Sequence, residues 1–204
     1  MSDTRTFLTA IGVALLAIAA AVWLYARGSV SALEGEDNPG PNLVITVEGE
    51  ANGQFVIDLL PDLAPRHVQR LVELARTGAY NGVAFHRVID GFMAQTGDVQ
   101  YGVVGADPSK AGQGASELPD LAPEFSDVPF RRGVVGMARK ARPDTANSQF
   151  FIMLAAGEHL NGDYTVVGHV LSGMGVVDQI KKGSTDLNGA VEDPDRMVSV
   201  RVEE

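Results

Sequence analysis

The stretch of sequence that decides the fold runs from Phe85 to Asp98 and reads F-H-R-V-I-D-G-F-M-A-Q-T-G-D. Its β-branched and apolar residues predict strands over Val83–Ile89 and Phe92–Gly97. Because side chains alternate along a strand, Phe85 and Arg87 are expected on one face. Taken alone, Arg87 fits a surface cation whose stem covers apolar neighbours, and the aromatic residues and the methionine fit a core. Function therefore has to be inferred from the order of the residue types along the whole stretch, because no single residue in it indicates a function by itself.

Six further segments show a strand pattern on either side of this stretch. They are Leu43–Val47, Gln54–Leu60, Gly133–Ala138, Gln149–Leu154, Thr165–Val170 and Met197–Val202. The first two are separated by a short polar turn and predict a hairpin. Eight short strands in a chain with 23 glycines favour a closed barrel or a sandwich over a helical fold.

Two helical segments interrupt the strands. Residues Pro65–Thr77 begin with a proline, carry apolar side chains at helical spacing and are followed by Gly78, which is a stop signal. Gly175–Lys181 predicts a shorter helix that ends before Gly183. Between the helices, Val99–Val128 is rich in Gly, Pro and Asp. A loop of that length in a compact domain is usually functional or mobile.

Composition limits the class of protein. The chain has 204 residues, of which 45% are hydrophobic, and this fits one folded domain with a tail. Its formal net charge of −10 argues against nucleic acid as a partner, because a phosphate backbone needs a cationic surface. The absence of cysteine excludes a disulfide framework, a zinc–thiolate site and a cysteine nucleophile.

The most apolar segment is Phe7–Tyr25, in which 19 consecutive residues carry no charge. As a helix it would be roughly 28 Å long, close to the hydrocarbon thickness of a bilayer, so it predicts a transmembrane anchor after a short tail, 1–6. A buried core helix would normally show a polar stripe, and a signal peptide cleaved after Ala32 stays open as an alternative. Residues 26–42 predict a flexible linker, and 43–204 the folded domain.

Several familiar motifs are absent or incomplete. Gly173–Asp178 resembles a dinucleotide-binding turn, but its last residue is an aspartate, which would repel a pyrophosphate. A serine-hydrolase elbow and a phosphate-binding loop do not occur. The four histidines are not spaced as metal ligands are: His67, His86, His159 and His169. His67 is expected on the surface. We therefore expect no metal and no cofactor.

The Phe85–Asp98 string closely resembles the signature of the cyclophilin family of peptidyl-prolyl cis-trans isomerases, F-H-R-V-I-x-x-F-M-x-Q-G-G-D. Thr96 takes the place of the first paired glycine. Three later strings are similar to family segments in the same order: G-V-V-G-M-A-R at 133–139, N-S-Q-F-F-I at 147–152 and L-N-G-D-Y-T-V-V-G at 160–168. The resemblance spans about Leu43 to Val202.

This resemblance implies a mainly β fold, a closed eight-stranded antiparallel barrel capped by two α-helices, here expected to follow an N-terminal transmembrane helix. It implies Arg87 as the catalytic cation, Gln149 as its support and Gln95 as the group that holds the peptide backbone. The other implied substrate-binding residues wall the proline pocket or flank it: Phe92, Met93, Ala138, Arg139, Phe151, His159, Leu160 and Tyr164.

Two of these wall residues depart from the family pattern. His159 stands where the family often has an aromatic residue, commonly tryptophan, and Tyr164 stands where it often has histidine. The first departure predicts weaker binding of the family's cyclic-peptide inhibitor. The second predicts a changed substrate preference without loss of turnover.

The residue types fit the implied chemistry. An X-Pro amide resists rotation by roughly 18–20 kcal/mol, and no bond has to be broken, so neither nucleophile nor general base is needed. A guanidinium that attracts the lone pair of the prolyl nitrogen would favour the twisted transition state over both planar ground states.

We therefore expect a peptidyl-prolyl cis-trans isomerase that acts on proline-containing polypeptides in folding or exported proteins. We expect it to be monomeric and held by residues 7–25 in the inner membrane of a bacterium, with the catalytic domain on the periplasmic side, or free in the periplasm if the segment is cleaved. The alternative is a non-catalytic module that holds proline-containing peptides in the same groove.

Overall fold

A single antiparallel sheet of nine strands dominates the computed structural model, which describes residues 36–204. In chain order the strands are β1 (Asn42–Glu48), β2 (Gly53–Leu59), β3 (Val83–Ala84), β4 (Arg87–Ile89), β5 (Met93–Thr96), β6 (Val134–Met137), β7 (Phe150–Met153), β8 (Val166–Ser172) and β9 (Arg196–Glu203). Their order across the sheet is β3-β9-β1-β2-β8-β6-β7-β5-β4. The predicted hairpin at the start of the domain is the β1–β2 pair, in register from Asn42↔Asp58 to Val47↔Gly53.

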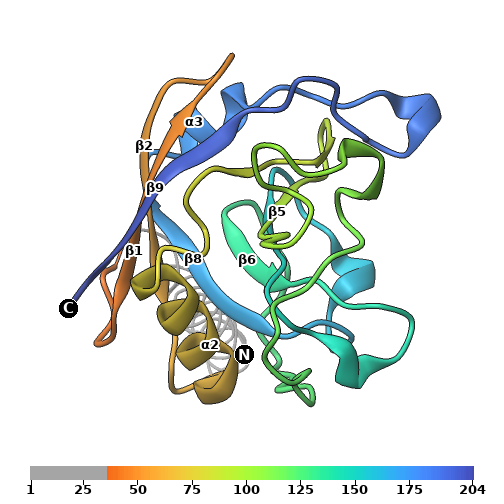
Figure 1. Ribbon diagram of the computed structural model, residues 1–204. Helices are drawn as coiled ribbons and strands as arrows, with labels where there is room; N and C mark the ends of the chain where they lie inside the picture. Colours follow the sequence, from red (N-terminus) through yellow and green to blue (C-terminus); the bar gives the residue numbers. More distant parts are fainter. Residues whose placement is uncertain (1–35) are drawn as a thin grey trace, which may run out of the picture. The chain divides into compact units, whose positions relative to one another are not determined.

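The sheet is an open, curled half-barrel, so the expected closed eight-stranded barrel is wrong (Figure 1). The segment predicted as one strand, Val83–Ile89, breaks into β3 and β4, and these two become the outermost strands at opposite ends of the sheet. The backbone groups at the break bond to the end of the chain: the N–H of Phe85 donates to the carbonyl of Asp195 at 2.9 Å, and that of Val88 to Gly189 at 2.8 Å. Because these donors and acceptors are already satisfied, the two edges do not pair and close the barrel.

The break also changes which side chains share a face. Phe85 and Val88 belong to the larger apolar cluster, inside the curl, whereas Ile89 packs with the smaller cluster on the other face, where Arg87 lies. The expectation that Phe85 and Arg87 share one face is therefore wrong, since strict alternation holds only within an unbroken strand.

Two α-helices and four short 3-10 turns complete the described part. Helix α2 (Pro65–Arg76) packs against β9, and α3 (Met174–Gln179) packs against β2, both within two residues of the predicted bounds. The 3-10 turns are η1 (Pro108–Lys110), η2 (Pro143–Thr145), η3 (Glu158–Leu160) and η4 (Thr185–Leu187).

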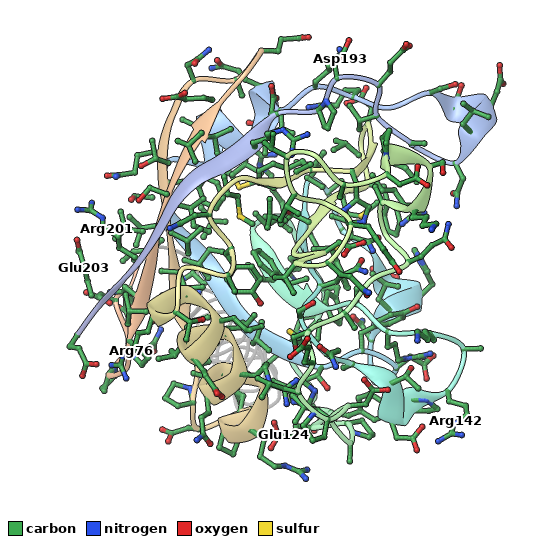
Figure 2. All side chains as sticks on the ribbon, in the orientation of Figure 1. Arg76, Glu124, Arg142, Asp193, Arg201 and Glu203 are labelled. Carbon is green, nitrogen blue, oxygen red and sulfur yellow. The ribbon has the colours of Figure 1, made fainter. Side chains whose placement is uncertain are left out.

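A carboxylate from a distant loop caps α2. Glu124 lies at the first turn of this helix (Figure 2), where it accepts the backbone N–H groups of Arg66 at 3.2 Å and His67 at 3.1 Å. It also accepts Nδ1–H of His67 at 2.6 Å. His67 is 0% exposed, so its predicted surface position is wrong: the ring is a buried partner of the cap.

Within residues 36–204, no helix has both the length and the apolar character that a bilayer crossing requires. The predicted tail, 1–6, and the predicted anchor, 7–25, lie outside the described residues.

Alternation along β7 divides the core in two. Phe150 and Ile152 point into the larger cluster, whereas Phe151 and Met153 point into the smaller one on the outer face. β5 and β6 alternate in the same way, and Gly136 on β6 leaves room for the outer rings, because a Cβ there would lie 2.6 Å from the ring of Phe151. The outer face of β5, β6 and β7 thus carries a second apolar layer, which holds the candidate site.

Candidate active site

One lateral row of residues crosses the outer face of the sheet. Arg87 on β4 lies opposite Gln95 on β5, Gln95 lies opposite Phe151 on β7, and Phe151 lies opposite Gly136 on β6. Directly opposed residues in antiparallel strands project from the same face and touch. Strand register therefore brings together side chains that are up to 64 positions apart in the sequence, a separation given by 151 − 87.

The guanidinium of Arg87 is held from two sides. Its Nη1 donates to Oε1 of Gln95 at 3.2 Å and lies 3.8 Å from Sδ of Met93. On the other side its Nε donates to the carbonyl of Asn188 at 2.9 Å, and its Nη2 to Oδ1 of the same residue at 3.0 Å. Burial lowers the pKa of Arg87, but an arginine keeps its charge at neutral pH. The site therefore presents a fixed, half-buried cation.

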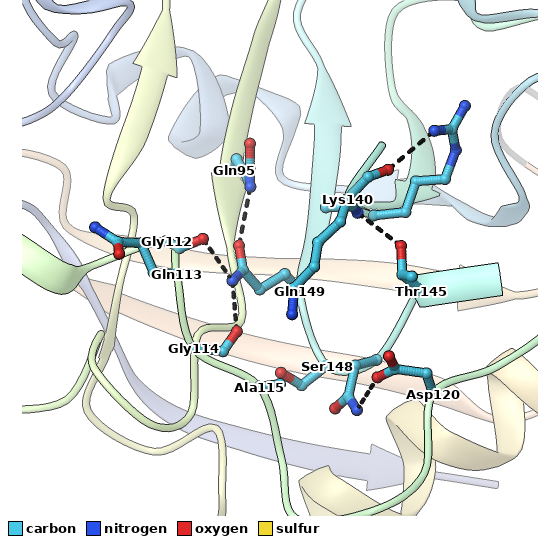
Figure 3. A pocket seen from close by; sticks show the side chains of 13 residues that line it. Gln95, Gly112, Gln113, Gly114, Ala115, Asp120, Lys140, Thr145, Ser148 and Gln149 are labelled. Carbon is cyan, nitrogen blue, oxygen red and sulfur yellow. Dashed lines mark hydrogen bonds between the residues drawn. The ribbon is translucent and has the colours of Figure 1, made fainter. Parts of the chain in front are cut away.

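Two glutamines connect Arg87 to a loop, and Figure 3 shows the hydrogen bonds between these glutamines and that loop. Nε2 of Gln149 donates to the carbonyls of Gly112 at 3.0 Å and Gly114 at 2.8 Å, and its Oε1 accepts from Nε2 of Gln95 at 2.9 Å. The two carbonyls accept only, so they fix the orientation of the first amide, and that amide fixes the second. The oxygen of Gln95 consequently faces Arg87. The implied support of Arg87 by Gln149 acts through Gln95.

A cavity of about 330 Å³, here called the Arg87 pocket, opens beside this guanidinium. Its apolar floor is nearly closed to solvent: Met93 is 2% exposed, Phe151 5% and Leu160 7%. Every sequence-predicted site residue except Gln149 lines it: Arg87, Phe92, Met93, Gln95, Ala138, Arg139, Phe151, His159, Leu160 and Tyr164. Gln149 lies in the adjoining cavity of about 320 Å³, which shares Gln95, Ala138 and Arg139 with the first.

Aromatic contacts build the walls of the Arg87 pocket. The ring of Tyr164 meets that of Phe151 edge to face, with centroids 5.7 Å apart, and the guanidinium of Arg139 lies 4.5 Å from its centre. Across the pocket, His159 packs on Phe92 at 5.4 Å. An apolar slot of this size with the Arg87 cation at its edge suits a small ring such as that of proline.

Sequence reasoning missed two residues that shape the site. Asn188 holds Arg87, and the only signal for it is the dipeptide Asn188-Gly189, which is typical of a tight turn. Asp98 is fully buried and accepts four backbone N–H groups of the following loop, including those of Gly112 and Gly114. Its position at the end of the Phe85–Asp98 string is the signal that was available.

The histidine next to Arg87 is buried, and no metal-binding cluster is found among the described residues. Among the described residues, no group of three or more histidine, aspartate and glutamate side chains converges as metal ligands do. Burial lowers the pKa of His86, the neighbour of Arg87, so its ring is neutral at neutral pH. The arrangement therefore offers electrostatic stabilisation and an apolar grip.

Comparison with known proteins shows the family of the chain. Residues 43–202 match the family model described as cyclophilin type peptidyl-prolyl cis-trans isomerase/CLD. A Brucella suis protein named probable peptidyl-prolyl cis-trans isomerase is 58% identical over 154 residues, which cover 74% of this chain and 79% of the relative. The mouse protein named peptidyl-prolyl cis-trans isomerase-like 1 is 37% identical over 138 residues, covering 63% and 74%.

Solved structures share the fold. A Cryptosporidium parvum cyclophilin-type isomerase, crystallised in the presence of the dipeptide Ala-Pro, superposes with a TM-score of 0.66 at 22% identity, covering 80% of this chain and 99% of the other. A cyclophilin from Hirschia baltica gives a TM-score of 0.64 at 24% identity, covering 83% and 74%. The chain belongs to the family of cyclophilin-type peptidyl-prolyl cis-trans isomerases.

Proposed function

We propose that the Arg87 pocket is the catalytic site of this isomerase, with Arg87 as the residue that acts on the prolyl nitrogen. The observation that carries the proposal is the placement of a fixed guanidinium at the mouth of an apolar slot floored by Met93, Phe151 and Leu160. The proline ring fills the slot, and the amide before it lies against Arg87.

Catalysis then consists of binding the twisted amide better than the planar one. In the planar ground states the lone pair of the prolyl nitrogen is delocalised into the carbonyl, which makes it a poor hydrogen-bond acceptor. As the bond rotates, the nitrogen becomes pyramidal and its lone pair can accept from an Nη–H of Arg87. Since Gln95 and Asn188 already hold the guanidinium, little reorganisation accompanies this step.

The substrates are proline-containing polypeptides. The structure of the Cryptosporidium parvum relative with the dipeptide Ala-Pro supports this choice of ligand, because that protein shares the fold. In our proposal, Gln95 and the backbone at Ala138 and Arg139 hold the chain on either side of the proline, since all three line the Arg87 pocket.

We also propose that the enzyme works as a monomer at the inner membrane of a bacterium, on the periplasmic side, where exported proteins fold. The uncharged run at residues 7–25 supports an anchor. Fractionation of native cells followed by N-terminal sequencing tests this: a full-length chain in the membrane fraction is expected. A soluble chain that starts at Leu33 would instead show a cleaved signal peptide.

The decisive measurement is cis-trans exchange in a short Ala-Pro peptide, followed by NMR with the full chain in a mild detergent. Arg87→Ala is expected to lower kcat/KM by about 10²–10³-fold, the usual loss when a transition-state donor is removed. Arg201→Ala, an exposed arginine on β9, is the matched control and should leave the rate unchanged. If the unmutated chain shifts peptide signals without accelerating exchange, the groove is a binding module and the catalytic proposal is overturned.

A further inference from the structure

Residues 183–191, here called the edge segment, cover the open edge of β4. The backbone N–H of Gly183 donates to the carbonyl of Val88 at 2.9 Å, and the N–H of Val88 donates to the carbonyl of Gly189 at 2.8 Å. Gly189 has φ +81°, and a Cβ there would lie 2.5 Å from the side chain of Ile89, so only glycine lets the segment lie this close. The segment is thus docked against the strand that carries Arg87.

Asn188 is the residue of the edge segment that reaches the guanidinium. It adopts φ 53°, which is uncommon for a residue other than glycine but accessible to asparagine. In this conformation both its carbonyl and its Oδ1 face Arg87, at 2.9 Å from Nε and 3.0 Å from Nη2. One residue therefore fixes two of the three guanidinium nitrogens.

Counting donors shows what remains for a substrate. An arginine has five N–H groups. Two of those of Arg87 bond to Asn188, one to Gln95, and a fourth makes the longer contact to sulfur of Met93. Among residues 36–204, the fifth, on Nη2, has no acceptor within hydrogen-bond distance.

We propose that Asn188 is a positioning residue: it holds Arg87 so that the remaining Nη2–H points at the prolyl nitrogen. This inference rests on the proposed catalytic role of Arg87. A free arginine side chain samples many rotamers, and ordering it before the substrate binds removes that cost from the transition state. Gln95 alone fixes only Nη1, which leaves the guanidinium free to turn about that contact.

Asn188→Gly is the test variant, because glycine keeps the positive φ and the backbone carbonyl and removes the side chain that carries Oδ1. Asp193→Gly is the matched control, since Asp193 has φ 48°, lies close by in the sequence and has no contact with Arg87. We expect Asn188→Gly to lower kcat about ten- to a hundredfold, the usual contribution of one hydrogen bond to a charged group, with the peptide Kd within twofold of the unmutated chain. Asp193→Gly should leave both unchanged.

Two further readouts separate positioning from a structural role. In an Arg87→Lys background the guanidinium fork is absent, so Asn188→Gly should have no further effect on kcat. In the ¹⁵N NMR spectrum, the two Nη groups of Arg87 should give separate signals in the unmutated chain, because Asn188 and Gln95 hold one each, and should exchange faster in Asn188→Gly.

The outcomes separate the positioning role of Asn188 from the catalytic role of Arg87. If Arg87→Ala abolishes turnover while Asn188→Gly turns over at the full rate, the positioning role is overturned and the proposed function stands. A loss that persists in full in the Arg87→Lys background also overturns it, since Asn188 would then act elsewhere. If Arg87→Ala is as active as the unmutated chain, the catalytic role of Arg87 itself fails.

Discussion

One buried carboxylate, that of Asp98, holds the long loop that follows β5. Its Oδ1 accepts the backbone N–H groups of Gln100 at 3.0 Å and Tyr101 at 2.8 Å. Its Oδ2 accepts those of Gly112 at 2.7 Å and Gly114 at 3.0 Å. The carbonyls of these two glycines fix the glutamine pair that orients Arg87. Asp98 therefore stabilises both the loop and, through the two glutamines, the position of Arg87.

Replacing Asp98 with asparagine tests this dependence. An amide has one oxygen, so in either orientation two of the four N–H groups lose their acceptor and face an NH₂ group. A hydrogen bond to a charged group contributes about 1.5–3 kcal/mol, so two of them amount to about 3–6 kcal/mol of unfolding free energy. This is a large part of the about 5–15 kcal/mol that stabilises an ordinary domain.

Urea unfolding of the full chain in detergent, followed by far-UV circular dichroism, measures the loss. With a slope of about 2 kcal/mol per M, the midpoint of Asp98→Asn should lie about 1.5–3 M below that of the unmutated chain. Asp107→Asn is the control, because Asp107 also bonds a loop N–H, at 3.0 Å, but is exposed, and its midpoint should barely move. A loss below about 1 kcal/mol in Asp98→Asn would refute the reasoning, since the two lost hydrogen bonds would then contribute much less than bonds to a charged group usually do.

Three further changes probe the pocket, a buried histidine and the edge segment. Phe151→Ala removes part of the floor of the Arg87 pocket. Because burying such a ring contributes about 3 kcal/mol, kcat/KM for an Ala-Pro peptide should fall about 10²-fold. A fall of less than threefold would contradict this prediction. Burial lowers the pKa of both His67 and His86, so below about pH 6.5 the unfolded state binds protons that the folded state does not. The unfolding free energy should therefore fall as the pH drops below about 6.5, by up to about 1.4 kcal/mol per pH unit for each ring. His67→Asn keeps a donor but cannot titrate, so pH-dependent urea unfolding should show about half that slope; an unchanged slope would place the lost protons elsewhere. Gly189→Ala should be less stable and less active than Gly105→Ala, because both have positive φ but only at Gly189 would the new Cβ meet an atom, at 2.5 Å; equal thermal midpoints would contradict the docking of the edge segment.

Features that depend on local pattern were predictable from the sequence. The hairpin of β1 and β2 and the bounds of α2 follow from alternation, helical spacing and stop signals, all of which act over a few residues. The grouping of the pocket residues followed from the resemblance, and strand register explains it: Arg87, Gln95 and Phe151 lie in one row because their strands are neighbours.

Features that depend on distant partners were not predictable. The predicted strand divides because Phe85 still bonds to Asp195, 110 positions later (195 − 85), in register with β3 and β9, whereas Val88 bonds to Gly189 and pairs with β5. His67 was placed on the surface because its helical position gives no sign of Glu124, 57 positions away, which buries it. In each case a polar group far along the chain decides between two conformations that the local sequence allows equally.

The family resemblance predicted which positions form the pocket but not how its unusual residues depend on each other. The family segment that residues 133–139 resemble, G-x-L-S-M-A-N, ends in asparagine where this chain has Arg139, and where the family often has histidine this chain has Tyr164. The guanidinium of the first lies 4.5 Å from the ring centre of the second, while its Nε and Nη2 donate to the carbonyl of Asp163, both at 3.1 Å. A phenol ring offers a cation a negative face at any physiological pH, whereas a histidine there would repel it once protonated. The two departures therefore act as one unit: the arginine ties the 161–164 turn to the end of β6, and the tyrosine makes that arginine part of the pocket wall.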